Sequence, residues 1–495
     1  MEKIKKLKIH PYYLGVCLII SLIFANSLMV TLDLDLLWHY KLGEEIIKTK
    51  TISLYNNFTW QMGLEWLQQE WIYDLMLYIM VFLFQSFGLF ILYAINLMLT
   101  FYGGAFWSKA QNKLMYLVIA VLTFFIIPAN KGNRPAEFSA WFILLIVWLW
   151  RSKEKHGCIW MFPLSVFMAN FHGGNIMTMT VALLILAIVD IVWDFREKKP
   201  FSLKHELGHL FPVILFILGS FINPALGKMW KTSLTMQSWE STSFIQEWKS
   251  WDISYVSGFV VLLTILSLGY ACYKSRFERI TCQDTSLICA FMLATMTTKK
   301  AGTILYLIFL ILAYRYIEQM CMDFFGSIKN KYLLKMYHYR PELRLTMVAC
   351  LIVCFFVVTT DNFEKNFTTY ANRDYSEEVI HILQEEEGTR IFNGYSEGNV
   401  FLFNDIKCFI DSRQFPYESN YGNNNSLNDY IEVVHANIID LDKTKDFLKE
   451  YDFEYIYNTK NTKPLEWYLD YEEHNYELIF ENEETQETLW KKKSS

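Results

Sequence analysis

Residues 11–31 read PYYLGVCLIISLIFANSLMVT, an apolar stretch without a charged side chain that is long enough to cross a bilayer. Further long apolar blocks lie at 174–195 and 345–360. The chain of 495 residues is 53% hydrophobic and only 19% charged, which is more apolar material than one soluble core requires. We therefore expect a polytopic α-helical membrane protein and exclude a purely soluble one.

Charge divides the chain into two parts. Residues 1–360 hold 32 Lys+Arg against 22 Asp+Glu, net +10, whereas residues 361–495 hold 13 against 29, net −16. An acidic, polar tail behind a basic membrane body predicts a separate water-exposed domain. Its single cysteine, Cys408, excludes a disulfide framework.

The spacing of apolar residues changes in the tail, residues 361–495, compared with the long apolar blocks before it. Short β-rich strings alternate with helical stretches, which predicts a small α/β domain at 361–495. No glycine-rich strand-to-helix loop is present, so we expect no nucleotide there. The expected strands lie near 390–393, 408–411, 454–457 and 476–480, and the expected helices at 375–387, 426–435 and 442–450.

Loop charge predicts the topology, because loops rich in Lys and Arg stay on the cytoplasmic side. The lysine-rich N-terminus should lie inside, together with the basic loops at 151–156, 196–199, 274–279 and 329–344. The outer side then receives 32–70, 130–137, 170–174, 223–253, 297–302 and the tail. This arrangement requires about 11 crossings, or 13 as the alternative, with 71–87 lying in the interface or re-entering.

The stretch Leu32-Asp33-Leu34-Asp35-Leu36-Leu37-Trp38-His39 follows the first expected span. Carboxylates and an imidazole at a membrane exit are costly against lipid, so they should face water or a cavity. Asp35 or Asp33 suits a general base, or one arm of a divalent-metal site. The alternative is that Asp35 caps the following helix.

Other polar residues lie at the same expected face. Glu70 beside Trp71 fits an interfacial anchor or a second carboxylate in the cavity. Fixed cations on an outer face suit an anion such as a lipid phosphate, or anionic headgroups in general. These cations are Lys131, Arg134, Lys299 and Lys300. His172, in Asn170-Phe171-His172-Gly173-Gly174, fits either a structural group or a binding group.

The string His205-Glu206-Leu207-Gly208-His209 matches the zinc-protease pattern. Such a site needs an acidic third ligand, which in intramembrane metalloproteases lies on a later helix. Asn223-Pro224-Ala225 lacks that acid. We therefore expect the string to be the polar cytoplasmic start of a helix, with an intramembrane zinc metalloprotease as the third functional hypothesis.

Taken in order, several motifs resemble a bacterial membrane family of GT-C-type glycosyltransferases. They cover most of the chain: Asp33 to Gly43, Glu70 to Ile72, Arg134-Pro135, Asn170 to Gly174, Asn223-Pro224, Glu247-Trp248, Gly394 to Gly398 and Phe409 to Arg413. The chain departs from the family at Leu37, where a second Trp is common, and at Ala136, where Gln is common.

The resemblance implies sugar transfer from a polyprenyl-phosphate donor to a hydroxyl on a glycan, lipid or protein acceptor, at the outer face of a bacterial plasma membrane. Asp35 or Asp33 would activate the acceptor, with Glu70 as a further catalytic candidate. Outer polar residues would bind substrate: His39, Lys131, Arg134, His172, Glu247, Lys299 and Lys300. Some GT-C relatives use a metal, which leaves open Mg²⁺ or Mn²⁺ at Asp33 and Asp35. No nucleic-acid partner is expected.

The competing class is a non-enzymatic polytopic protein for transport or envelope assembly. Transporters carry charges near mid-span and often contain internal repeats. We find no repeat in the sequence, and the polar residues cluster at the outer ends of the apolar blocks. The sequence therefore favours the glycosyltransferase.

Overall fold

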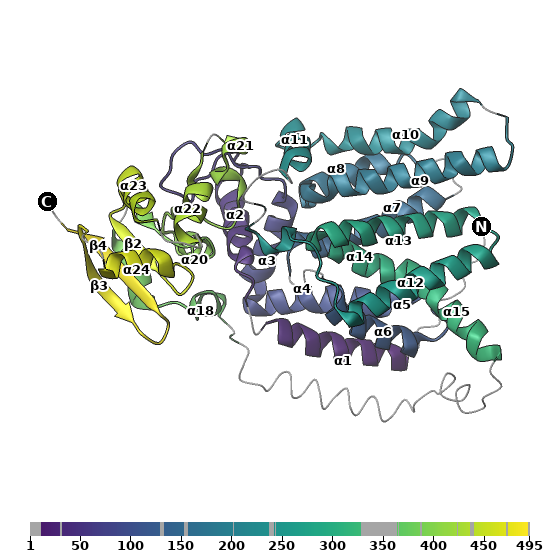
Figure 1. Cartoon of the computed structure of the whole chain (residues 1–495), viewed down its shortest axis with the longest axis horizontal. Helices are drawn as coiled ribbons and strands as arrows, with labels where there is room; N and C mark the ends of the chain where they lie inside the picture. Colours follow the sequence, from purple (N-terminus) through teal and green to yellow (C-terminus); the bar gives the residue numbers. More distant parts are fainter. Residues whose placement is uncertain are drawn as a thin grey trace.

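The computed structural model describes residues 11–29, 32–128, 133–152, 157–200, 202–236, 242, 244–327, 364, 366–386, 389–422, 424–435, 440–471 and 474–493. The expectations for Lys131, for the 329–344 loop and for the 345–360 block lie outside these residues. The described part consists of a large helical bundle and a smaller α/β domain at one end of it (Figure 1).

The elements of the bundle are all helices. In chain order they are α1 (Pro11–Leu28), α2 (Asp35–Thr49), α3 (Trp71–Phe84), α4 (Ser86–Met98), η1 (Leu99–Gly103), α5 (Gly104–Trp107), α6 (Lys113–Ile126), α7 (Pro135–Arg151), α8 (Met161–Phe171), η2 (Gly173–Asn175), α9 (Ile176–Arg196), α10 (Leu203–Ser220), α11 (Gly227–Thr235), η5 (Gln246–Trp248), α12 (Tyr255–Lys274), α13 (Arg279–Thr297), η6 (Lys299–Ala301), α14 (Gly302–Ile308), η7 (Phe309–Ala313) and α15 (Tyr314–Ser327).

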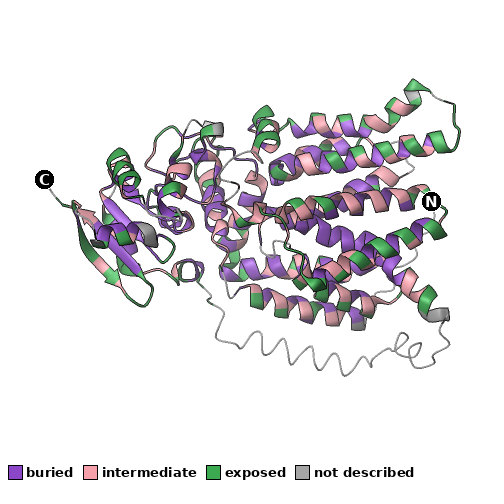
Figure 2. Cartoon of the chain, viewed as in Figure 1, coloured by how far each residue is buried: buried purple, intermediate pink, exposed green. Residues whose placement is uncertain are grey.

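Four helical stretches of the described chain are long and apolar enough to cross a membrane: Ser86–Trp107, Gly173–Arg196, Tyr255–Lys274 and Lys299–Phe324. Five shorter apolar helices accompany them, at Tyr13–Leu28, Trp71–Phe84, Lys113–Ile126, Met161–Phe171 and His205–Ser220. The outward faces of the bundle are exposed and carry large apolar side chains such as Phe125, Val192 and Phe259 (Figure 2). This architecture fits a helical membrane protein, while the number of crossings stays a prediction.

Helix α3 is separate from α4. The chain breaks at Gln85, which has a left-handed φ of 54°. With 14 residues, α3 is about 21 Å long, less than the roughly 30 Å of a hydrocarbon core. It packs tightly on α2, because a Cβ added at Gly43 would collide with the backbone of Asp74. Helices α6 and α8 are no longer than α3, so the expectation that 71–87 does not cross stays a prediction.

The tail folds as the expected α/β domain. Its sheet has the order β1-β2-β4-β3, with β1 and β2 parallel and the other pairs antiparallel. The strands are β1 (Ile391–Phe392), β2 (Tyr455–Asn458), β3 (Tyr476–Asn482) and β4 (Glu487–Lys492). Its helices are α18 (Phe367–Asn372), α19 (Glu377–Glu385), α20 (Gly398–Phe403), η8 (Phe415–Tyr417), α21 (Ser419–Gly422), α22 (Ser426–Val434), α23 (Leu441–Tyr451) and α24 (Lys463–Tyr471).

One expected strand was wrong. Residues 408–411 form no strand, and Cys408 makes only an isolated bridge with Thr59 in the loop between α2 and α3. The Cys408 backbone bonds to that loop instead: Cys408 N–H donates to Phe58 O, and Trp60 N–H donates to Cys408 O. The Asn393 side chain takes the next two backbone groups, Phe409 N–H and Ile410 O. The fourth strand is β4, which the alternation analysis missed.

The loop between α2 and α3, residues 50–70, is built into the tail domain. Leu64 belongs to the tail's buried apolar cluster, and Trp60 packs against it. Thr59 donates a hydrogen bond of 2.7 Å to Cys408 O, and Trp60 Nε1 donates one of 3.1 Å to Ile391 O. The loop therefore anchors the tail domain against the end of the bundle where α2, α3 and α7 begin.

Candidate functional site

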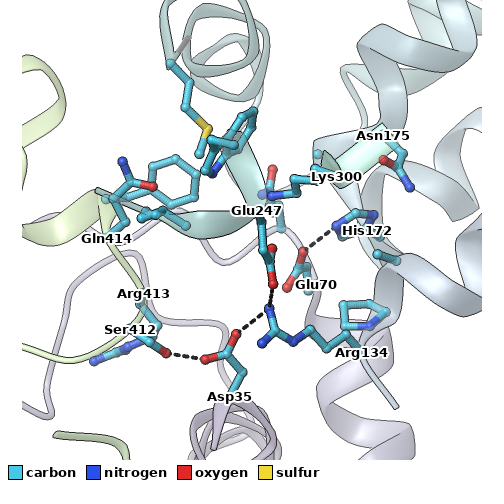
Figure 3. A pocket seen from close by; sticks show the side chains of 18 of the residues that line it. Asp35, Glu70, Arg134, His172, Asn175, Glu247, Lys300, Ser412, Arg413 and Gln414 are labelled. Carbon is cyan, nitrogen blue, oxygen red and sulfur yellow. Dashed lines mark hydrogen bonds and ion pairs between the residues drawn. The ribbon is translucent and has the colours of Figure 1, made fainter. Parts of the chain in front are cut away.

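A cavity of about 680 Å³ lies between this end of the bundle and the tail domain (Figure 3). Helix ends supply its polar lining, since Asp35 opens α2, Glu70 precedes α3, and Arg134 precedes α7. His172 follows α8 and Lys300 lies in η6. Side chains at helix ends converge here because the apolar bodies of the helices pack behind them.

Arg134 joins three carboxylates at the floor of the cavity. Its Nε donates to Asp33 Oδ2 at 2.5 Å, and its Nη1 contacts Asp35 Oδ2 at 2.9 Å and Glu247 Oε1 at 2.6 Å. Nη2 also donates to Asp33 Oδ1 at 3.0 Å. The planar guanidinium thus fixes the orientation of all three acids.

Asp35 is not the cap of its helix. The residue before α2 is Leu34, which cannot cap it, and the first amide of the helix, Asp35 N–H, donates to Asp33 Oδ1 at 3.2 Å. Ser412 of the tail instead donates a hydrogen bond of 2.5 Å to Asp35 Oδ1. Burial raises the pKa of Asp35 to about 6, with Arg134 and Ser412 opposing the rise and Asp33 and Glu247 adding to it. Asp35 is thereby an ionised carboxylate at neutral pH with more basicity than an exposed aspartate.

The hydrogen-bond donors around the three carboxylates decide whether a divalent ion fits there. Carboxylate oxygens are the ligands that Mg²⁺ and Mn²⁺ prefer. In this structure the oxygens of Asp33 and Asp35 face one guanidinium and one hydroxyl. Because the guanidinium already pairs with these oxygens, the arrangement does not fit Mg²⁺ or Mn²⁺.

Glu70 and His172 form a second polar pair across the cavity, with Glu70 Oε1 and His172 Nε2 3.2 Å apart. Burial raises the pKa of Glu70 to about 8 and lowers the pKa of His172 to about 3. Ser139 Oγ donates to Ala136 O and lies 3.2 Å from His172 Nδ1. The Ser139 hydroxyl proton is used in the bond to Ala136 O, so His172 Nδ1 must carry the proton that joins it to Ser139 Oγ. His172 Nε2 then accepts a hydrogen bond from protonated Glu70.

His39 lies deeper than the other site residues. Its Nδ1 is 2.6 Å from Asp74 Oδ1, while its Nε2 is 3.7 Å from Glu70 Oε2. Burial lowers the pKa of His39, and Arg134 and His172 lower it further. His39 is therefore a neutral group that supports the wall of the cavity.

The two expected lysines behave differently. Lys300 lines the cavity, and its Nζ lies 4.5 Å from the ring centroid of Trp248. Lys299 is not among the lining residues, and its backbone N–H donates to Lys249 O. Together with the hydrogen bond from Thr298 Oγ1 to Glu247 O, this contact ties the 246–248 turn to η6.

The tail contributes lining residues that motif analysis did not assign to the site. They are Tyr395, Ser396, Ser412, Arg413, Gln414 and Phe415. Arg413 and Asp411 form an ion pair, 2.6 Å apart and fully buried. Arg413 Nη1 is buried without a hydrogen-bond partner among the described atoms. The Phe409 to Arg413 string was the available signal, but its place beside Asp35 depends on the tail's docking.

The His205/His209 string lies away from this cavity. Both Nε2 atoms approach Asp194 Oδ2, at 2.7 and 2.8 Å. The expected acidic third ligand was sought on a helix after the histidines. In the structure an acid faces them from the preceding helix, α9, instead.

Comparison of the chain with models of known protein families and with curated proteins finds no match.

Proposed function

We propose that this chain is a GT-C-type membrane glycosyltransferase that moves a sugar from a polyprenyl-phosphate donor to an acceptor hydroxyl at the outer face of the membrane. The observation that carries the proposal is Asp35, a carboxylate with a raised pKa in a cavity at the helix ends, held by Arg134 and Ser412. Cell-envelope glycoconjugate assembly is the setting that such a donor and such a location imply.

In the proposed step, the acceptor oxygen forms a bond to the anomeric carbon of the sugar while the bond from that carbon to the phosphate oxygen breaks. The electron pair leaves on the lipid phosphate. The acceptor proton passes to the carboxylate of Asp35. A pKa of about 6 leaves Asp35 ionised at pH 7 and close enough to the working pH to accept this proton.

The departing phosphate requires a cation. Arg134 already donates through Nε, Nη1 and Nη2 to carboxylates, so its role is to orient Asp33 and Asp35. Lys300 extends into the cavity from η6 and is the better phosphate ligand (Figure 3). Arg413 is fully buried over the rings of Phe58 and Trp66, so we assign it to the wall of the cavity and not to the phosphate.

Protonated Glu70 holds neutral His172 on the opposite wall. We assign this pair to substrate positioning, because a neutral carboxyl and a neutral imidazole offer hydrogen bonds without adding charge beside Asp35. The aromatic rings of Trp38, Trp66 and Phe415 line the same cavity and suit the apolar face of a sugar.

The test is transfer by the purified full-length chain in proteoliposomes. A panel of radiolabelled polyprenyl-phosphate sugars is supplied with an envelope extract as acceptor. We expect label in the acceptor with release of one polyprenyl phosphate per sugar transferred. If protein shown to be folded transfers sugar from no donor in the panel, the proposal is wrong.

A further inference from the structure

A second polar cluster lies at the other end of helix α9. Asp194, near the end of α9, faces His205 and His209, which are one turn apart near the start of α10. The imidazole ring centroids are 5.1 Å apart, and both Nε2 atoms approach the same carboxylate oxygen. Asp194 lies 17 residues beyond Met177 of the outer cavity, or about 26 Å along the helix.

The three ligand atoms have the chemistry of a transition-metal site. Two imidazole nitrogens and one carboxylate oxygen lie within 4.8 Å of one another. Zinc in a tetrahedral site takes such ligands at about 2.0–2.2 Å, which places them roughly 3.3 Å from each other. The Nε2 atoms lie 2.7 and 2.8 Å from Asp194 Oδ2. Lengthening each of these two distances by about half an ångström would make room for the ion.

The surroundings leave the site accessible. Lys199 Nζ contacts Asp194 Oδ1 at 2.5 Å, which leaves Oδ2 for the imidazoles. The His205 side chain is 49% exposed, so water can reach a fourth coordination position. Glu206 lies between the histidines in sequence, and its Oε2 is buried without a hydrogen-bond partner among the described residues.

We propose that Asp194, His205 and His209 bind one Zn²⁺-class ion that clamps α9 to α10, separately from the outer cavity. Imidazole with a single carboxylate favours Zn²⁺ over Mg²⁺ or Ca²⁺. The ion would replace the shared carboxylate oxygen as the link between the two histidines. Because the ligands come from neighbouring helices, its binding should stabilise the folded chain.

The experiment measures metal in the full-length protein. The purified chain is stripped with a chelator, incubated with Zn²⁺, freed of excess metal by gel filtration and analysed by mass spectrometry. We expect one zinc per chain in the wild type and in Glu206→Gln, because Glu206 is not a ligand. His205→Ala and His209→Ala should retain less than a tenth of it. His381→Ala, a change at an exposed histidine of the tail, is the matched control.

Cobalt gives a measurement that needs no variant. Co²⁺ added to the stripped wild type should produce the visible absorption of a four-coordinate site, and Zn²⁺ should abolish it. Failure of the wild type to hold zinc, or full zinc in both histidine variants, would overturn the proposal. Loss of zinc in Glu206→Gln would show that the ligand set is wrong.

Discussion

Ser412 donates a hydrogen bond to Asp35 across 377 residues of sequence. This contact joins the tail domain to the first turn of α2, so the cavity is complete only when the tail is docked. The chemistry assigned to Asp35 therefore depends on a domain that lies outside the helical bundle.

Ser412→Ala should move the acidic limb of the pH–rate profile to higher pH. The Ser412 hydroxyl stabilises the ionised form of Asp35 and so lowers its pKa, and its removal must raise that pKa above about 6. A base is active when ionised, so transfer rises as pH rises through this pKa. The measurement is kcat/KM against pH, with Ser396→Ala as the control. An unchanged limb, or one shifted to lower pH, would show that Asp35 is not the group that titrates.

Glu70→Gln should retain most transfer, whereas Glu70→Ala should lose about 5- to 150-fold in kcat/KM. The amide can still donate to His172 Nε2, while alanine leaves a buried acceptor without a partner, at a cost of about 1–3 kcal/mol. Wild-type activity should fall as pH rises through about 8, where Glu70 loses its proton. This alkaline fall should be absent from Glu70→Gln. Inactivity of Glu70→Gln at all pH values would instead make Glu70 a base.

Lys300→Met should raise KM for the lipid donor at least tenfold, and Lys300→Arg should restore most of the affinity. A cation that contacts the phosphate stabilises the bound donor as well as the transition state. Lys299→Met provides a matched control, since Lys299 is not among the residues lining the cavity. Equal effects of the two methionine variants would indicate a general charge effect on the outer surface.

Asp411→Ala should destabilise the tail domain by about 3–5 kcal/mol, because it leaves the Arg413 guanidinium buried without its counter-ion. Glu432→Ala removes the exposed partner of Lys443 from within helix α22 and should cost less than about 1 kcal/mol. Thermal unfolding followed by tryptophan fluorescence compares the two variants. Similar unfolding midpoints would show that the buried pair contributes little to stability.

The sequence predicted the helices and strands better than the contacts between segments that are distant in sequence. Apolar periodicity identified the helical body and most of the tail's strands, because both depend on local patterns. The segment 408–411 was misassigned because its backbone partners come from residues 58–60, far away in sequence. The same long-range docking explains why Ser412 and Arg413 were not assigned to the site. Asp194 was overlooked because the expected acid was sought only after the histidines.

The most direct test of the central claim is a single-turnover comparison of Asp35→Asn with Asp252→Asn, a matched change at an exposed carboxylate between η5 and α12. Both variants are assayed at saturating polyprenyl-phosphate sugar, after donor binding has been measured separately. The account predicts that Asp35→Asn binds donor but transfers sugar about 100- to 10,000-fold more slowly, while Asp252→Asn matches the wild type. Transfer by Asp35→Asn at the wild-type rate would contradict it.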